Sequence, residues 1–184
     1  MNCIEKHYNN LIKYDLALKF NYKNINEIPK LKYIILNFGC KTSDFKKLSI
    51  SSLILQFITK KRSKLNFSKK SNIFLKIRKG QPVGCQVILK KKKMYEIAFY
   101  LLKIISNIKY DFSLKITNTK SITFNLFNLF NFNVVEKNYI FFNSINSLNV
   151  TLVFNKNINN EIPFVLNYLK FNQTKRISNS TGRV

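Results

Sequence analysis

The chain has few of the residues on which metal sites and most enzymes depend. Its 184 residues include one histidine, His7, and three cysteines. Because Cys3, Cys40 and Cys85 are far apart in the sequence and odd in number, they predict neither a disulfide framework nor a Cys-x-x-Cys metal site. We expect reduced cysteines and no bound metal.

Acidic residues are equally scarce. All eight stand singly in the sequence, at Glu5, Asp15, Glu27, Asp44, Glu96, Asp111, Glu136 and Glu161. No two are placed for acid–base catalysis, His7 has no second histidine to work with, and the phosphate-loop, nucleophile-elbow and zinc-protease motifs are absent. The sequence therefore predicts a protein that is not an enzyme, with no catalytic residue and no cofactor.

Long hydrophobic runs are missing as well. The longest uncharged run, from Asn138 to Asn155, is interrupted by asparagine and serine, whereas a membrane helix needs about 20 mostly apolar residues. The N-terminus has no charged-then-apolar signal sequence, and Glu5 argues against an arginine-rich transit peptide. We expect no membrane span, and synthesis in the compartment where the protein works.

Positive charge is what the chain has in abundance. The 32 Lys and Arg residues against eight Asp and Glu give a formal net charge of +24, which repels itself in a compact fold and indicates a polyanionic partner. Hydrophobic residues make up 46%, and a chain of this length buries roughly 70% of its unfolded surface as one domain. We predict a single domain over 1–171 and a polar basic tail over 172–184.

Hydrophobic periodicity predicts an α+β fold, with an antiparallel sheet and helices packed on one face. The expected helices are 4–20, 45–58, 94–108 and 161–171, and the expected strands include 31–37 and 148–154. The Phe-Asn repeat of 124–133 fits neither the strand period nor the helix period, so its structure stays open at this point.

Residues 76–96 predict a long basic β-hairpin loop. Gly80 and Gly84 permit positive φ, and Pro82 between them lacks a backbone donor, so strand pairing should stop there in a turn. The flanking strands would be 73–78 and 85–90, both basic, with a rigid uncharged tip. An isolated lysine run is usually a solvated surface, but the net charge of the whole chain favours a binding role.

The pattern favours folded RNA as the polyanion. The sequence has no zinc finger, basic leucine zipper, convincing helix-turn-helix or RNP signature of an RNA-recognition motif. RNA is commonly recognised through its shape and its 2′-hydroxyl groups, while cations on the protein neutralise its phosphates. A charged hairpin on a rigid sheet suits that mode of recognition.

Several separated motifs resemble one family. They are Tyr22-Lys23-Asn24, Ile28-Pro29-Lys30-Leu31, Ile34-Ile35-Leu36-Asn37-Phe38-Gly39, Lys-Ile-Arg-Lys-Gly-Gln-Pro-Val-Gly-Cys over 76–85, and Met94-Tyr95-Glu96. In order and spacing, over residues 5–115, they resemble the bacterial-type large-subunit ribosomal protein five. Residues 148–171 resemble the final strand and helix of that family more loosely.

The resemblance implies a structural protein of the central protuberance that binds 5S rRNA and large-subunit rRNA and contacts P-site tRNA through the loop of 69–84. It also implies neighbouring ribosomal proteins, including those of the small-subunit head, as partners. The rRNA-binding residues expected from the resemblance and from the basic stretch after the second helix are Asn37, Lys61, Arg62, Lys64, Lys90 and Lys91. The residues expected in the tRNA-facing loop are Lys69, Lys70, Lys76, Arg78, Lys79, Gly80, Gln81 and Gly84.

The chain departs from the family pattern in two regions. Lys60-Lys61 stands where the family usually has Gly-Gln, and Ile88 stands where a threonine is usual, which suggests that charge replaces a hydrogen-bonded contact. The family's Phe-Asp-Gly-Arg-Gly-Asn-Tyr segment and its Glu-Gln…Phe-Pro-Glu continuation are missing from 121–143.

Composition indicates where the protein works. Asn, Lys, Ile and Phe are over-used while Ala, Gly, Val and Asp are scarce, as expected for coding DNA rich in A and T, and this is typical of an organelle genome. We predict a mitochondrial ribosomal protein, with a plastid as the less favoured location. The rival hypothesis is a free-standing organellar nucleic-acid-binding or RNA-processing factor.

Overall fold

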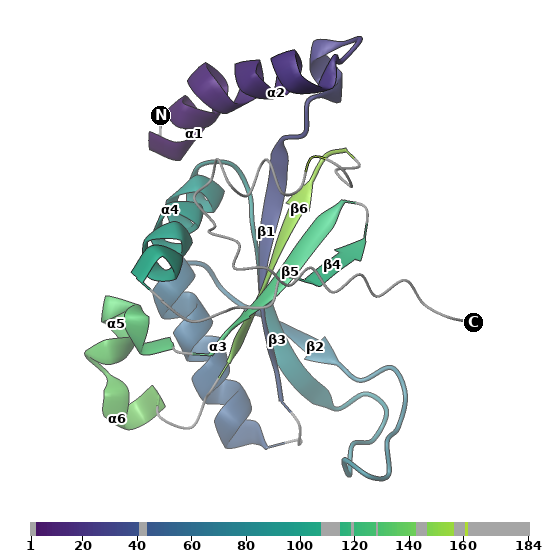
Figure 1. Cartoon of the computed structure of the whole chain (residues 1–184). Coiled ribbons are helices and arrows are strands. Elements are labelled where there is room, and N and C mark those ends of the chain that lie inside the picture. Colours follow the sequence, from purple (N-terminus) through teal and green to yellow (C-terminus); the bar gives the residue numbers. More distant parts are fainter. Residues whose placement is uncertain are drawn as a thin grey trace. The chain divides into compact units, whose positions relative to one another are not determined.

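A computed structural model describes residues 3–40, 44–107, 115–118, 120–127, 129–142, 147–156 and 161 (Figure 1). The helices are α1 (Cys3–His7), the π-helix η1 (Tyr8–Ile12), α2 (Lys13–Phe20), the 3₁₀ helix η2 (Ile25–Glu27), α3 (Phe45–Thr59), α4 (Lys91–Asn107), the 3₁₀ helix η3 (Leu129–Asn131), α5 (Asn133–Glu136) and α6 (Tyr139–Phe142). The strands are β1 (Leu31–Gly39), β2 (Lys64–Phe67), β3 (Pro82–Leu89), β4 (Lys115–Asn118), β5 (Ser121–Leu126) and β6 (Leu148–Phe154).

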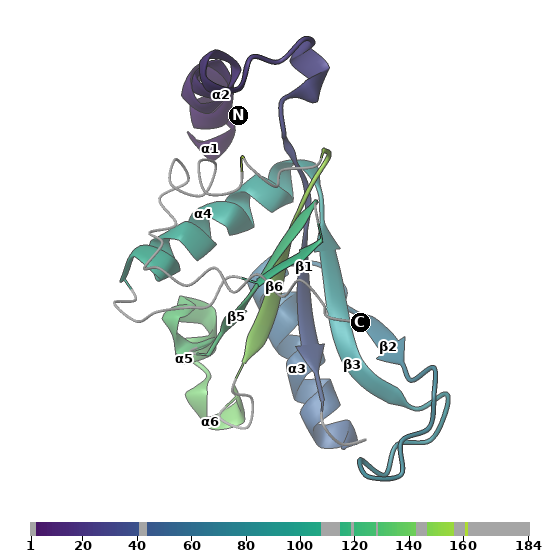
Figure 2. The same ribbon diagram turned by 45° about the vertical axis from the view of Figure 1, so that its right-hand side comes forward.

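These strands form an antiparallel sheet in the order β2-β3-β1-β6-β5-β4. Contacts divide the chain into two compact units: α1, α2, α4 and β4 belong to the first, and α3, α5, α6 and β2 to the second. Strands β1, β3, β5 and β6 have residues in both. In the first unit, α4 lies on one side of the strands. In the second unit, α3, α5 and α6 lie together on one side of the strands (Figures 1 and 2). The predicted α+β class is confirmed.

The predicted N-terminal helix is present, but a π-helical turn interrupts it. A π turn inserts an extra residue and therefore rotates the apolar face. Ile12 and Leu16 are fully buried, whereas the apolar Leu11 and Leu18 are exposed. In this first unit α1 packs against α4, and the Tyr8 hydroxyl donates a hydrogen bond of 2.5 Å to the Pro29 carbonyl.

Strand β1 buries only one of its faces. Ile34, Leu36 and Phe38 are buried, while Tyr33 and Ile35 between them are half-buried. The unbroken apolar sequence suggested burial of the whole centre, but the strand alternates as an antiparallel strand does when its second face is only partly covered.

Helix α3 forms over nearly the predicted range, and its buried side chains are Leu48, Ser51, Ile54, Leu55 and Thr59. The apolar Phe45, Leu53 and Phe57 of the same helix are exposed.

Helix α4 also confirms the prediction. Met94, Ile97, Ala98, Leu101 and Ile104 are buried along one side. Phe99, expected to widen that apolar face, is half exposed.

The Phe-Asn repeat has a mixed period because it passes from a strand into a 3₁₀ helix. Phe124 and Leu126 are buried two residues apart at the end of β5, and Leu129 and Phe132 are buried three residues apart around η3. The predicted helix 161–171 and the tail 172–184 lie outside the described residues, apart from Glu161, so the boundary between domain and tail stays a prediction.

Candidate nucleic-acid interface

The hairpin formed by β2, residues 68–81 and β3 is held by backbone hydrogen bonds well beyond its strands. The Ser68 amide donates to the Gln81 carbonyl (2.9 Å), and the Gly80 amide donates to the Ser68 carbonyl (3.0 Å). Further out, the Asn72 amide donates to the Ile77 carbonyl (2.8 Å) and the Ile77 amide to the Asn72 carbonyl (3.0 Å). The long loop is therefore ordered by its own main chain.

A second set of bonds shapes the turn at Gly80. The Arg78 amide donates to Gln81 Oε1 (2.9 Å), and the Gln81 amide returns a bond of 3.2 Å to the Arg78 carbonyl. The same carbonyl accepts a bond of 2.5 Å from Ser68 Oγ. Gly80 has φ +84°, a conformation that costs other residues free energy. The predicted positive φ of Gly80 is confirmed.

The prediction for Gly84 is wrong. Gly84 has no positive φ; it is a buried residue in the middle of β3, and a Cβ built there would lie 2.5 Å from the Phe38 carbonyl oxygen on β1. Glycine is needed at this position because two backbones approach closely. Pro82 is the first residue of β3 and pairs with Phe67 at an irregularity in the register, a position where proline is tolerated in a sheet.

Residues 73–76 form the outer turn of the hairpin, between the bridged residues Asn72 and Ile77, so the expected strand 73–78 is wrong. Ile73 is 90% exposed and Phe74 98% exposed. The Lys76 amide donates to the Ile73 carbonyl (3.0 Å), and Lys76 adopts φ +52°. The predicted uncharged tip, Gly80 to Gly84, is therefore not the tip of the hairpin. The outer turn consists of the apolar Ile73, Phe74 and Leu75 together with Lys76, so it is not uncharged.

Cations surround this apolar tip. The exposed basic residues of the loop are Lys69, Lys70, Lys76, Arg78 and Lys79. All of them were predicted for the tRNA-facing loop, and the structure brings them together on one hairpin. Gln81 is half-buried and stabilises the turn through its side chain.

The basic residues after α3 have local structural roles. Lys60 ends the helix with φ +49°, which explains why glycine is usual there in the resembled family. Lys61 Nζ donates a hydrogen bond of 2.8 Å to the Ile88 carbonyl on β3. The expectation that charge alone replaces a hydrogen bond is therefore wrong, because Lys61 makes one.

Three other predicted rRNA-binding residues also belong to the second unit. Arg62 and Lys64 are exposed. Asn37 is half-buried on β1, and its Oδ1 accepts a hydrogen bond of 3.2 Å from Asn66 Nδ2 on β2. This side-chain bond ties β2 to β1, which lies on the other side of β3 in the sheet.

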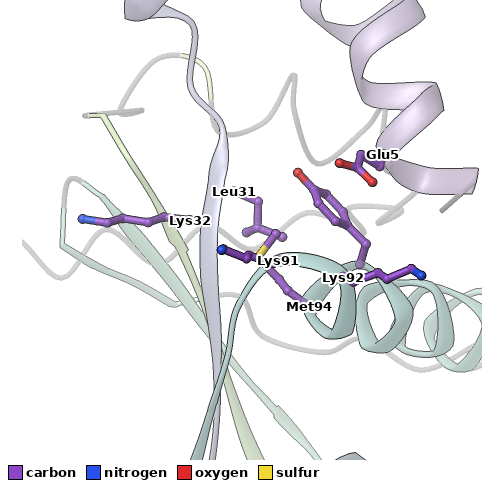
Figure 3. Close-up of a pocket in the computed structure, with 7 residues that line it drawn as sticks. Glu5, Leu31, Lys32, Lys91, Lys92 and Met94 are labelled. Carbon is purple, nitrogen blue, oxygen red and sulfur yellow. The ribbon is translucent and has the colours of Figure 1, made fainter. Parts of the chain in front are cut away.

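A second basic site lies in the first unit, where β1 and the start of α4 line a cavity of about 530 Å³ (Figure 3). Its lining residues are Glu5, Leu31, Lys32, Lys91, Lys92, Met94 and Tyr95. The lysine side chains point in different directions in Figure 3, so they suit phosphates spread along a backbone better than one enclosed anion. Lys90 is exposed beside them.

Sequence reasoning selected Lys91 of this cavity and the neighbouring Lys90, but missed the other lining residues. Lys92 belongs to the same run of four lysines, and the alternation of β1 exposes Lys32, so both signals were available. Burial raises the pKa of Tyr95, and the nearby Glu5 charge adds to that effect.

The described residues contain no group of three or more His, Cys, Asp or Glu side chains able to hold a metal ion. Within the same ranges, no helix has the length and apolar character needed to cross a membrane.

A known ribosomal protein is similar to this chain over most of its length. The large ribosomal subunit protein uL5m of Reclinomonas americana is 34% identical over 159 residues, which cover 83% of this chain and 87% of the relative. The chain belongs to the uL5 family of large-ribosomal-subunit proteins. No family model matches the chain.

Bacterial members of the uL5 family match a shorter part. The uL5 of Clostridium acetobutylicum is 38% identical over 91 residues, or 48% of this chain and 51% of the relative. The uL5 of Trichlorobacter lovleyi is 33% identical over 99 residues, or 53% of this chain and 55% of the relative. The relatives are named as ribosomal proteins, which confirms the prediction that the chain is not an enzyme.

Proposed function

We propose that this protein is a structural constituent of the large subunit of the mitochondrial ribosome, located in the central protuberance, where it binds large-subunit rRNA and 5S rRNA. The observation that carries the proposal is the 34% identity to a uL5m protein over 83% of the chain. The net charge of +24 fits a protein surrounded by RNA. Sedimentation tests it: the chain should follow the large subunit through a moderate-salt gradient, and a chain that stays at the top indicates a free-standing factor.

For rRNA we propose Asn37, Lys61, Arg62, Lys64, Lys90 and Lys91 as contact residues, and we add Lys32 and Lys92 of the cavity. Each phosphate neutralised by a lysine releases condensed counterions, so the contribution of these residues should fall as salt rises. The 5S rRNA content of isolated large subunits is the test. Lys91→Gln with Lys92→Gln should lower it, while the same change at the exposed Lys6 and Lys30 should not.

We propose that the hairpin loop of 69–84 contacts P-site tRNA. Its main-chain hydrogen bonds hold the tip in shape before binding, which lowers the entropic cost of forming a contact. Lys69, Lys70, Arg78 and Lys79 suit tRNA phosphates, and the exposed Phe74 suits an exposed base face. Stacking of a base on an aromatic side chain contributes about 1–3 kcal/mol.

The tRNA proposal is tested with Arg78→Ala combined with Lys79→Ala. Large subunits should still incorporate this variant, because both side chains are exposed and the carbonyl of Arg78, not its side chain, holds the turn. Retention of P-site tRNA should fall, and its salt dependence should weaken by about one unit of slope for each lost phosphate contact. Failure of the variant to enter large subunits would make the loop an assembly element instead.

The uL5 resemblance also extends the proposed partners to neighbouring ribosomal proteins, including those of the small-subunit head.

A further inference from the structure

The cavity of the first unit has a lining that phosphate contacts alone do not explain. Its volume of about 530 Å³ is that of a site for a small molecule, about 300–1,000 Å³. Lys32 and Lys92 are exposed and point to opposite sides in Figure 3. Glu5 contributes a half-buried carboxylate to the same lining. Because a carboxylate repels phosphate, the interior of the cavity suits a different chemical group from its rim.

The contact between two helices brings this carboxylate to an apolar and aromatic surface. Helix α1, which carries Glu5, packs against α4. The Glu5 charge raises the pKa of Tyr95, second to burial, so the carboxylate and this side chain are close. Met94 of α4 is buried and Leu31 of β1 half-buried, and both line the cavity. Unstacked RNA bases bind to such surfaces, stacked on aromatic or apolar side chains with their Watson–Crick edges hydrogen-bonded.

The carboxylate of Glu5 selects among the bases. An ionised carboxylate only accepts hydrogen bonds, and it has two oxygens to do so. Guanine presents two adjacent donors on its Watson–Crick edge, the N1–H and the N2 amino group. Adenine and cytosine present an amino group beside an acceptor nitrogen, and uracil presents one N–H between two carbonyls. Those three bases each turn an acceptor toward the carboxylate, so guanine is the matching base.

The rim of the cavity suits the phosphates of the same nucleotide. Lys91 and Lys92 are the first residues of α4, and the N–H groups and dipole of a helix N-terminus attract anions. Lys91 has φ +53°, which turns the chain from β3 into this helix. A nucleotide offers donors on its base and negative charge on its phosphates, whereas a lone phosphate or a lone cation matches only one part of the lining.

We propose that the cavity binds one unpaired guanine of rRNA, inserted base first, with Glu5 accepting hydrogen bonds from its Watson–Crick edge and the rim lysines contacting its phosphates. This inference rests on the proposed ribosomal function and deepens the rRNA contact of the same cavity by naming the nucleotide. Glu5, the one acidic residue among the described lining residues, becomes a specificity-determining residue.

Kethoxal footprinting of isolated large subunits tests the inference, because this reagent reacts with N1 and N2 of unpaired guanine. Subunits that contain the parent chain should protect one such guanine, which becomes at least about fivefold more reactive in the Glu5→Gln variant. Glutamine has nearly the shape of glutamate, but its amide accepts from one donor and turns N–H groups toward the other. Reverse transcription of both rRNAs identifies the nucleotide and the molecule that supplies it.

Glu96→Gln is the matched control. Glu96 lies on α4 and is exposed, outside the cavity lining, so this variant undergoes the same change of charge and should keep the protection. The sign of the Glu5→Gln effect also discriminates between two roles. If Glu5 only tempered the charge of the lysines, its neutralisation would tighten RNA binding, and protection would increase.

Photo-crosslinking locates the base independently. A benzophenone amino acid replaces Lys32, an exposed lining residue, in the full-length chain, and large subunits are isolated and irradiated. The adduct should map to the same guanine or to a nucleotide next to it.

The outcomes separate the two proposals. Large subunits without the parent chain would overturn the ribosomal function and this inference with it. Large subunits that contain the chain would overturn the guanine site alone in any of three cases: no guanine gains reactivity in Glu5→Gln, Glu96→Gln exposes the same guanine, or the crosslink from position 32 maps elsewhere or does not form.

Discussion

Replacing Gly84 by alanine is the most direct test of how the hairpin is anchored. Gly84 lies buried in β3 beside β1, and the added Cβ would sit 2.5 Å from the Phe38 carbonyl oxygen, where ordinary contact begins at 3.4 Å. The strands must therefore separate locally by about 0.9 Å, the difference between those two distances. The three nearest atoms, of Phe38 and Gly39, are all backbone, so no flexible side chain is available to give way.

The cost follows from packing. Forcing one extra methyl into a close-packed region typically costs about 1–3 kcal/mol. For a chain of this size each kcal/mol shifts the melting temperature by roughly 2–4 °C, so Gly84→Ala should lower it by about 2–12 °C. Valine at this position should cost more, because its two additional methyl groups meet the same strand.

Two other glycines are matched controls for Gly84→Ala. A Cβ at Gly39 meets nothing within 4 Å, and its φ is not positive, so Gly39→Ala should change the free energy of unfolding by no more than about 0.5 kcal/mol. Gly80 also has open space but a φ of +84°, so Gly80→Ala should cost about 1–2 kcal/mol through the backbone alone.

Urea and thermal unfolding of the purified full-length variants measure these differences. The expected order of destabilisation is Gly84 first, then Gly80, with Gly39 near the parent chain. If Gly84→Ala unfolded together with Gly39→Ala, the close approach of β3 to β1 would be refuted.

Three further predictions concern single side chains. Lys60→Gly should stabilise the protein by about 1 kcal/mol in urea unfolding, because Lys60 holds φ +49° at the end of α3; destabilisation would mean that its side chain contributes more than the strain costs. Burial is the main cause that raises the pKa of Tyr8 above its ordinary value. The stability that the neutral hydroxyl contributes is therefore fully present below about pH 10, the ordinary pKa of tyrosine, and is lost as the pH rises above it. Tyr8→Phe should cost about 1–3 kcal/mol at neutral pH, since Pro29 loses its donor, and should flatten the alkaline decline in stability; an unchanged decline would contradict this. Burial also raises the pKa of the Cys85 thiol, so iodoacetamide should label Cys40 before Cys85 in the native protein, and early labelling of Cys85 would contradict its burial.

Local sequence rules succeeded where local geometry decides the structure. Gly80 was predicted correctly because the bonds that shape its turn join residues close to it in the sequence, with the exception of Ser68. Gly84 was predicted wrongly because glycine is required there by the close approach of the Phe38 backbone on another strand. A single sequence does not reveal such a long-range approach. The bounds of α3 followed its periodicity to within one residue, whereas α4 begins at Lys91, three residues before the predicted start.

The tip of the hairpin escaped prediction because two of its features run against residue preference. Lys76 takes a left-handed conformation that lysine rarely adopts. Ile73 and Phe74, strand-forming residues by propensity, are exposed in a turn. The closing pair of bonds between Asn72 and Ile77 fixes this geometry, and the Asn72 side chain assists by accepting from the Leu75 amide at 3.3 Å.

Exposed aromatic side chains of the second unit differ in the charge of their neighbours, and this difference changes how they can bind a partner. An aromatic side chain among lysines adds stacking to a contact whose strength depends on counterion release. An aromatic side chain without lysines binds by excluding water, and salt weakens such a contact little. Raising the salt concentration during isolation of ribosomes should thus weaken the proposed tRNA contact around Phe74. Retention of P-site tRNA that does not change with salt would mean that the cations of the hairpin contribute little to that contact.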